Sequence, residues 1–158
     1  MSGTTKAKLY REQHQQIRAV IAGEPSRTAR FASAACLLAQ AFAPRFYWTG
    51  FYEVDPGKAD ELVVGPYQGT LGCLRIPFAR GVCGAAAREQ KTQMVDDVHA
   101  IADHIACDAA SRSEIVVPVF DGQGVLQAVL DVDSTDIAAF DEDDKAGLEA
   151  ICADLLAP

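Results

Sequence analysis

The sequence predicts one α+β domain in which a central, mostly antiparallel β-sheet carries helices packed on one side. Three observations lead to this fold class: two amphipathic helical patterns at the start, several short β-prone segments in the middle and a further helical pattern at the end. A length of 158 residues, with 49% hydrophobic and 23% charged side chains, is typical of one globular domain. We therefore expect residues 1–158 to form a single domain.

Helical periodicity marks both ends of the chain. Residues 6–22 are polar with a modest apolar stripe, and Pro25 and Ser26 open a second helix that Pro44 closes. The last helix is expected to begin after Asp141, whose carboxylate is suited to cap it. The apolar faces recur at helical spacing, through Phe31, Ala35, Leu38 and Phe42 in the second helix and Leu148, Ile151 and Leu155 in the last.

The middle of the chain changes to strands. Residues 46–52 are aromatic and β-prone, and the Asp-Pro-Gly segment at 55–57 has the composition of a tight turn. Short apolar runs bounded by glycine or proline follow at 62–64 and 73–76, so Cys73 is expected to begin a strand. These segments predict the first strands of the sheet.

The second half of the chain contains a short helix, a loop and further strands. An alanine run predicts a short helix at 81–88, and a further strand is plausible at 92–95. Residues 97–112 show no clean period, and we expect a loop with one helical turn, which is long enough to suggest a function. The strongest β signals, at 114–120 and 125–132, flank a turn and predict a hairpin.

The charge and the apolar pattern exclude several classes of partner. The formal net charge is −8, so the surface field should repel phosphate backbones and anionic membrane surfaces, and no nucleic-acid or membrane partner is expected. Residues 1–8 lack the apolar run of a signal peptide, and no stretch approaches the length of a spanning helix. These observations predict a cytoplasmic protein.

The five cysteines do not have the pattern of a structural disulfide framework or a zinc ribbon, because their number is odd and no C-x-x-C occurs. Cys36 and Cys152 lie on expected helices and are interpreted as packing residues. A zinc site that combines the other three cysteines with His104 is disfavoured, since the ligand spacing fits no compact pattern. The glycines form no phosphate-binding loop, so we expect neither a metal nor a cofactor.

Four stretches carry a family resemblance: 48–52 (WTGFY), 72–84 (GCLRIPFARGVCG), 103–118 (DHIACDAASRSEIVVP) and 129–134 (VLDVDS). Together they resemble the free methionine-(R)-sulfoxide reductases, a family built on the GAF domain. Two departures are visible: Ala79 stands where the family usually has glycine, and Gly-Ala-Ala at 84–86 replaces a more usual Gly-Thr-Ala. The resemblance implies a single GAF-type domain over residues 1–158.

The resemblance also implies a reaction. A cysteine thiolate attacks the sulfur of free methionine-(R)-sulfoxide, an acid protonates the departing oxygen, and the resulting sulfenic acid condenses with a second thiol to an intramolecular disulfide. The nucleophile corresponds to Cys107 and the main resolving cysteine to Cys73, while Cys83 matches an auxiliary family cysteine. An external dithiol such as thioredoxin must then reopen the disulfide.

The residues near these cysteines in the sequence are compatible both with reactive thiols and with inert, buried ones. His104 and Arg112 lie near Cys107 and could favour its thiolate, although a buried, inert loop cysteine is the plain alternative. Cys83 lies near the N-terminus of an expected helix, where the helix dipole lowers a thiol pKa. We expect the Cys107 loop to move between the reduced and the oxidised states.

Three acidic residues are candidates for the proton donor. Asp131 and Asp133 are two residues apart on one strand, so their carboxylates share a face. Such a pair is usually solvated, but the apolar neighbours suggest a low dielectric and a raised pKa. By resemblance Glu114 belongs to the substrate site; we assign Asp133 or Glu114 to protonation and Asp131 to the substrate ammonium.

Trp48 and Tyr52 are expected to line the substrate pocket. An indole face suits the methyl group beside a sulfoxide sulfur, although most tryptophans simply pack. His99 and His104 are interpreted as surface residues of the long loop.

A competing interpretation is a non-catalytic GAF module that binds a small ligand or senses redox state, because a fold does not imply an activity. The residues alone set neither the epimer, nor the preference for free methionine, nor the reductant, and they leave homodimer formation open.

Overall fold

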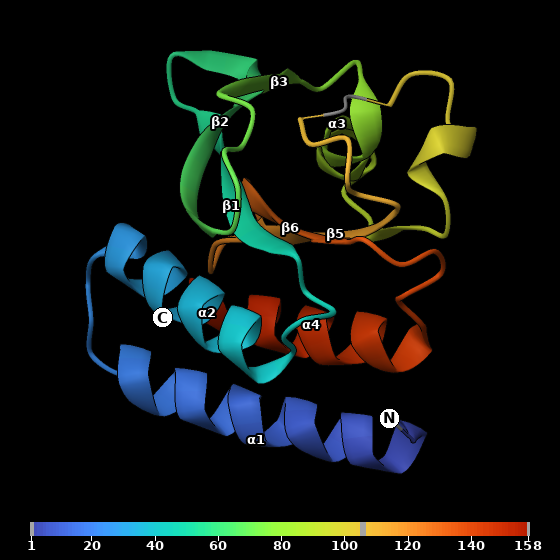
Figure 1. The fold of residues 1–158 in the computed structure, drawn as a ribbon. Helices are drawn as coiled ribbons and strands as arrows, with labels where there is room; N and C mark the ends of the chain where they lie inside the picture. Colours follow the sequence, from blue (N-terminus) through green and yellow to red (C-terminus); the bar gives the residue numbers. More distant parts are fainter. Residues whose placement is uncertain (1, 105–106, 158) are drawn as a thin grey trace.

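The computed structural model describes residues 2–104 and 107–157. In this part of the chain four α-helices, one 3₁₀ turn and six strands follow the order shown in Figure 1. The helices are α1 (Gly3–Ile21), α2 (Arg27–Ala41), α3 (Gly81–Glu89) and α4 (Glu142–Leu155), and the 3₁₀ turn is Val98–Ala100. The strands are β1 (Trp48–Asp55), β2 (Lys58–Gln68), β3 (Arg75–Pro77), β4 (Gln93–Val95), β5 (Ser113–Phe120) and β6 (Leu126–Ser134).

The six strands form one sheet in the order β3-β2-β1-β6-β5-β4, and every neighbouring pair is antiparallel. Two tight turns build its hairpins. Asp55 accepts a hydrogen bond from the backbone N–H of Gly57, and Asp121 accepts from Gln123 and Val125, as aspartates in turns commonly do. The pairing of β1 with β6 joins the two hairpins, so the centre of the sheet is made from residues far apart in the sequence.

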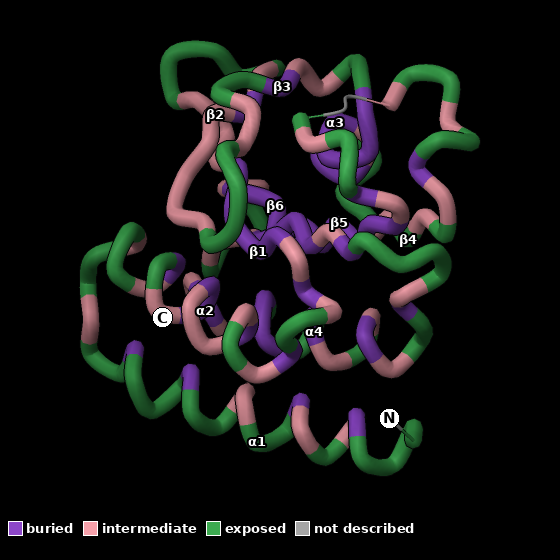
Figure 2. The backbone as a smooth tube through the Cα atoms, in the orientation of Figure 1, coloured by how far each residue is buried: buried purple, intermediate pink, exposed green. Residues whose placement is uncertain are grey.

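The three long helices α1, α2 and α4 cover one face of this sheet, with α1 outermost (Figure 1). Between them and the strands lies the larger core, in which apolar side chains of the helices meet those of β1, β5 and β6. Figure 2 shows this arrangement as a buried sheet and buried inner helix faces beneath exposed outer surfaces. The predicted α+β class with an antiparallel sheet is therefore confirmed.

The short helix α3 lies on the opposite face of the sheet, where the edge strand β3 curls towards it (Figure 1). A second, smaller apolar cluster forms there from α3, from the adjoining strands and from Trp48 and Tyr52. The face away from the long helices is thus covered only in part, and it carries the pocket described below.

The helix starts follow the expected chemistry. The Ser26 hydroxyl accepts a hydrogen bond from the N–H of Ala29, and Asp141 forms a reciprocal capping box with Asp144. Cys152 lies in the larger core and Cys36 is half-buried on α2, which is consistent with packing. No helix in the described residues is both long and apolar enough to cross a membrane.

A buried carboxylate ties the first helix to the last. Asp144 is fully buried; the Tyr10 hydroxyl donates to it at 2.6 Å, and Lys6 Nζ and Arg45 lie 3.0 Å from its oxygens. Lys6 Nζ also contacts Asp141 at 2.7 Å. These contacts dock α1 on α4 through a buried network of hydrogen bonds and ion pairs centred on Asp144.

One expected boundary is wrong. Cys73 does not begin a strand but lies in the loop before β3, which starts at Arg75. The loop crosses closely over the aromatic side chains of β1: a Cβ on Gly72 would lie 2.9 Å from Cζ2 of Trp48 and 3.1 Å from the Tyr52 hydroxyl. This close crossing holds the segment out of the sheet register.

Candidate active site

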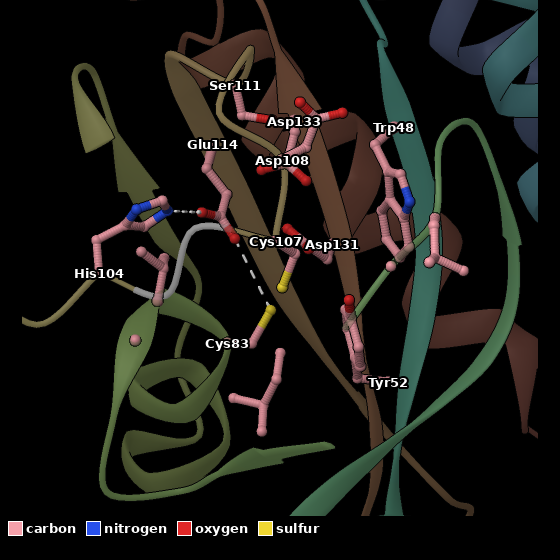
Figure 3. Close-up of a pocket in the computed structure, with 15 residues that line it drawn as sticks. Trp48, Tyr52, Cys83, His104, Cys107, Asp108, Ser111, Glu114, Asp131 and Asp133 are labelled. Carbon is pink, nitrogen blue, oxygen red and sulfur yellow. Dashed lines mark hydrogen bonds and ion pairs between the residues drawn. The ribbon is translucent and has the colours of Figure 1, made fainter. Parts of the chain in front are cut away.

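One pocket gathers most of the residues predicted from the sequence. It lies over β1, β5 and β6, between α3 and the loop that contains Cys107 (Figure 3). Seven of the eight predicted site residues line it: Trp48, Tyr52, Cys83, Cys107, Glu114, Asp131 and Asp133. The eighth, Cys73, is joined to it through a disulfide with Cys107.

The sheet register brings the three acidic residues together. Glu114 of β5 lies directly opposite Asp133 of β6, and Asp131 follows two residues away on the same face. Asp131 and Glu114 are each only 5% exposed, and Asp133 is partly buried. No lysine or arginine among the described residues forms an ion pair with any of the three.

This environment changes the acidity of the aspartates. Burial raises the pKa of Asp131 well above its ordinary value, and the negative charges of Asp133 and Glu114 raise it further. The pKa of Asp133 is raised as well, first by burial and then by Glu114. The pocket floor therefore favours the protonated form of these carboxyl groups, which is the form that can donate a proton.

An aromatic wall from β1 closes the other side. The rings of Trp48 and Tyr52 are nearly parallel with centroids 5.5 Å apart, and Trp48 also stacks on Tyr67 at 5.1 Å. The indole N–H donates to the backbone oxygen of Thr70 at 2.8 Å, which holds the ring in place. The wall presents flat apolar surface opposite the carboxyl groups (Figure 3).

The disulfide links two loops at the rim of the pocket. Cys73, before β3, is bonded to Cys107, which is 34 residues later in the chain, and their Cα atoms are 5.4 Å apart. This separation is typical of disulfides. Of the five cysteines, the two that the family resemblance marks as nucleophile and resolving residue are the two that are bonded.

Cys83 differs from the sequence-based expectation. Its thiol, near the start of α3, is 3% exposed and donates to Glu114 Oε1 at 3.8 Å. Burial raises its pKa well above the ordinary thiol value, and the carboxylates of Asp131 and Glu114 add to the effect. The expected lowering by the helix dipole is therefore wrong, because burial and two nearby acidic groups outweigh it.

The loop histidine also differs from expectation. His104 is not a surface residue: its side chain is 12% exposed, lines the pocket and places Nε2 3.7 Å from Glu114 Oε2. Arg112, the other basic group near Cys107 in the sequence, does not line the pocket.

Asp108 and Ser111 line the pocket and were not singled out from the sequence. Asp108 Oδ2 accepts hydrogen bonds from the hydroxyls of Tyr47, at 2.9 Å, and Thr70, at 2.6 Å. Its other oxygen accepts the backbone N–H of Ala110, and these donors lower the pKa of Asp108. Asp108 thereby fastens the segment after Cys107 to the residue before β1 and to the loop before β3, although in the sequence it looks like an ordinary turn residue.

Comparison with known proteins decides the family. Residues 26–156 match the GAF domain family. A free methionine-R-sulfoxide reductase of Escherichia coli (strain K12) is 41% identical to this chain over 150 residues, which cover 95% of this chain and 88% of the relative. The chain belongs to the free methionine-R-sulfoxide reductase family.

Solved structures of the free methionine-R-sulfoxide reductase family have the same fold. That of the Neisseria meningitidis enzyme in complex with its substrate has a TM-score of 0.89 at 49% identity and covers 95% of this chain and 87% of its own. The structure of fRMsr of Staphylococcus aureus in its reduced form has a TM-score of 0.86 at 39% identity, with 93% and 92% covered. The likeness therefore extends over at least 93% of this chain.

Proposed function

We propose that this protein reduces free methionine-(R)-sulfoxide to methionine with its own thiols. The observation that carries the proposal is the Cys73–Cys107 disulfide at the rim of a pocket whose floor holds acidic groups with raised pKa values. The relatives from Escherichia coli and Neisseria meningitidis are named for this activity, and the latter was solved with its substrate.

The reaction proceeds in two balanced steps. The Cys107 thiolate attacks the sulfoxide sulfur while the sulfoxide oxygen takes up a proton. The hydroxyl then passes to the Cys107 sulfur as the bond between the two sulfurs breaks, and the products are methionine and a Cys107 sulfenic acid. The Cys73 thiol then attacks the sulfenic sulfur and releases water, which leaves the Cys73–Cys107 disulfide. Oxygen leaves the substrate, and the two protein thiols supply both electrons.

The pocket floor supplies the proton and the binding charge. Asp133 or Glu114 protonates the departing oxygen, since the raised pKa of Asp133 keeps a proton available. Asp131, whose Oδ1 has no hydrogen-bond partner among the described residues, binds the substrate ammonium, and the positive charge of the ammonium favours the ionised form of its carboxyl group. The face of Trp48, with Tyr52 beside it, packs against the methylthio end of the substrate.

Regeneration of the thiols needs an external dithiol, for which we propose thioredoxin in a reducing cytoplasm. The surface around Cys73 supports docking of a protein reductant, because Leu71 and Leu74 are 78% and 70% exposed on either side of it. Exposed apolar side chains next to a redox-active bond are typical of a protein-binding surface.

Thiol counting in a single turnover tests the proposal. Pre-reduced protein, mixed with free methionine-(R)-sulfoxide without reductant, should form one methionine and lose two thiols per chain. The Cys36→Ser variant, altered on the far side of the sheet, should behave identically because Cys36 lies outside the pocket. Ligand binding with no loss of thiols would instead identify a non-catalytic GAF module.

A further inference from the structure

The pocket floor holds a side-chain set that the proposed reaction does not fully use. The Cys83 sulfur and one carboxylate oxygen each from Glu114 and Asp131 all lie within 4.8 Å of one another. All three residues are at least 95% buried, and in Figure 3 their side chains converge from α3, β5 and β6. A thiol between two carboxyl groups is unusual for an apolar domain core.

The charges of this set are incompletely compensated. Asp131 Oδ1 has no hydrogen-bond partner among the described residues, although it is buried. Besides the two aspartates, Glu114 contacts the Cys83 thiol at 3.8 Å and His104 Nε2 at 3.7 Å. Buried acidic oxygens without a fixed cation favour a bound cation, since an unpaired polar group in this environment is costly.

We infer that Cys83, Glu114 and Asp131 form a binding site for one zinc ion, with the fourth coordination position open to water, and that zinc in this site excludes the substrate. Zinc accepts sulfur, nitrogen and oxygen ligands in tetrahedral sites. Magnesium and calcium require sets of oxygen ligands, which this cluster does not offer. The binding step is balanced: Zn²⁺ replaces the thiol proton of Cys83 and any proton held by the two carboxyl groups, and all of these protons are released to solvent.

The ligand set differs from the zinc site that the sequence analysis disfavoured. That set required Cys73 and Cys107, which are joined in a disulfide here. The present set uses Cys83, which is free while that disulfide is formed, and it adds two carboxylates. The carboxylates come from neighbouring strands, so ligand spacing along the chain gives no sign of the site.

Exclusion of the substrate follows from shared atoms and rests on the proposed function. Asp131 Oδ1, to which we assign the substrate ammonium, would be a zinc ligand or lie next to one. The zinc ion and the substrate ammonium compete for the same buried carboxyl group at the end of one pocket, and this group must be ionised to bind either of them. The metal is therefore an inhibitor of this protein and not a cofactor.

The test uses tag-free protein with its disulfide formed, so that Cys73 and Cys107 cannot bind the metal. Calorimetric titration with Zn²⁺ should give one site per chain, and Co²⁺ at the same site should show a thiolate charge-transfer absorption. Cys83→Ser should abolish that absorption, and Asp131→Asn should weaken zinc binding by at least about tenfold. Circular dichroism checks that each variant is folded.

The matched control is Cys36→Ser, which removes a free thiol outside the pocket and should leave both signals unchanged. Unaltered zinc binding in folded Asp131→Asn, or a retained thiolate absorption in Cys83→Ser, would overturn the site. Free methionine-(R)-sulfoxide should displace Co²⁺, and persistence of the absorption at saturating sulfoxide would overturn the exclusion. These readouts need no turnover, so failure of the proposed function is recognised separately, by thiol counting.

Discussion

At the scale of single residues, the two bonded cysteines have distinct expected phenotypes. Cys107→Ser should abolish the first stoichiometric reduction because it removes the attacking thiolate. Cys73→Ser should still form one methionine per chain, but recycling by thioredoxin should slow severely because no disulfide can form at that position. Rapid quench followed by amino-acid analysis measures both.

Either cysteine assignment can fail independently. A normal first turnover in Cys107→Ser would refute its role as nucleophile. Recycling of Cys73→Ser at the wild-type rate would show that Cys83, which lines the same pocket, resolves the sulfenic acid.

Among the acidic residues, Asp133→Asn separates proton transfer from binding. An amide cannot deliver a proton, so kcat should fall by about 10²-fold or more while KM changes little. Steady-state kinetics with free methionine-(R)-sulfoxide decide the point. A raised KM at unchanged kcat would mean that Asp133 binds the ammonium and that the roles assigned to the two aspartates are reversed.

At the scale of elements, the contact of α1 with α4 depends on Lys6. Lys6→Met keeps the length of the side chain but leaves buried Asp144 with one cation fewer, which should cost about 1–3 kcal/mol in the free energy of unfolding. Lys8→Met is the matched control: Lys8 is exposed and faces Glu12 at 3.7 Å, so the expected change is below about 0.5 kcal/mol. Urea unfolding at pH 7 measures the free energy of unfolding of both variants. Equal losses in the two would contradict a stabilising role for the contacts around Asp144.

The contact between α1 and α4 also predicts how the stability of the protein changes at low pH. Partial burial raises the pKa of Asp141, but the hydrogen bonds from Lys6 and from the capping box prevail and lower it to about 2. The folded protein binds the proton of the Asp141 carboxyl group less tightly than the unfolded chain does. The ionised carboxylate therefore makes its full contribution to the free energy of unfolding above about pH 4, and this contribution is lost as the pH falls towards 2. In Lys6→Met this part of the acid dependence should shrink.

The boundaries of helices and strands could be predicted where they depend on neighbouring residues in the sequence. They could not be predicted where they depend on residues far away in the chain. Ser26 and Asp141 marked helix starts because a cap needs only a side chain and the next turn. The strand expected at Cys73 failed because the course of that loop depends on Trp48, which is 25 residues earlier, and no local pattern records such a crossing.

The same distinction holds for the pocket. The two-residue period of a strand predicted that Asp131 and Asp133 share a face. The pairing of Glu114 with Asp133 and the contact of His104 with Glu114 depend on sheet register and loop geometry, so they emerge only in the folded chain. The raised pKa of Cys83 could not be predicted for the same reason: it results first from burial in the folded chain and then from carboxyl neighbours on β5 and β6.

At the scale of the whole molecule, the pocket predicts selectivity for the free amino acid. A zwitterionic substrate brings an ammonium to the buried carboxyl end, whereas an acylated amino group would leave Asp131 unpaired. We expect kcat/KM for N-acetyl methionine sulfoxide to be at least about tenfold lower, which corresponds to about 1.4 kcal/mol. Equal values in a thioredoxin-coupled assay would indicate an open pocket and a different substrate class.

The strand order divides the pocket into two mechanical parts. Trp48, Glu114 and Asp131 stand on β1, β5 and β6, each of which is hydrogen-bonded to a strand on both sides. The two bonded cysteines stand on loops, outside the hydrogen-bond ladder of the sheet. Opening the floor would require breaking the central sheet, whereas rearranging the rim would not. The groups that must hold a fixed geometry thus belong to the most cooperative part of the fold, and those that must exchange bonding partners belong to segments that can shift without unfolding it.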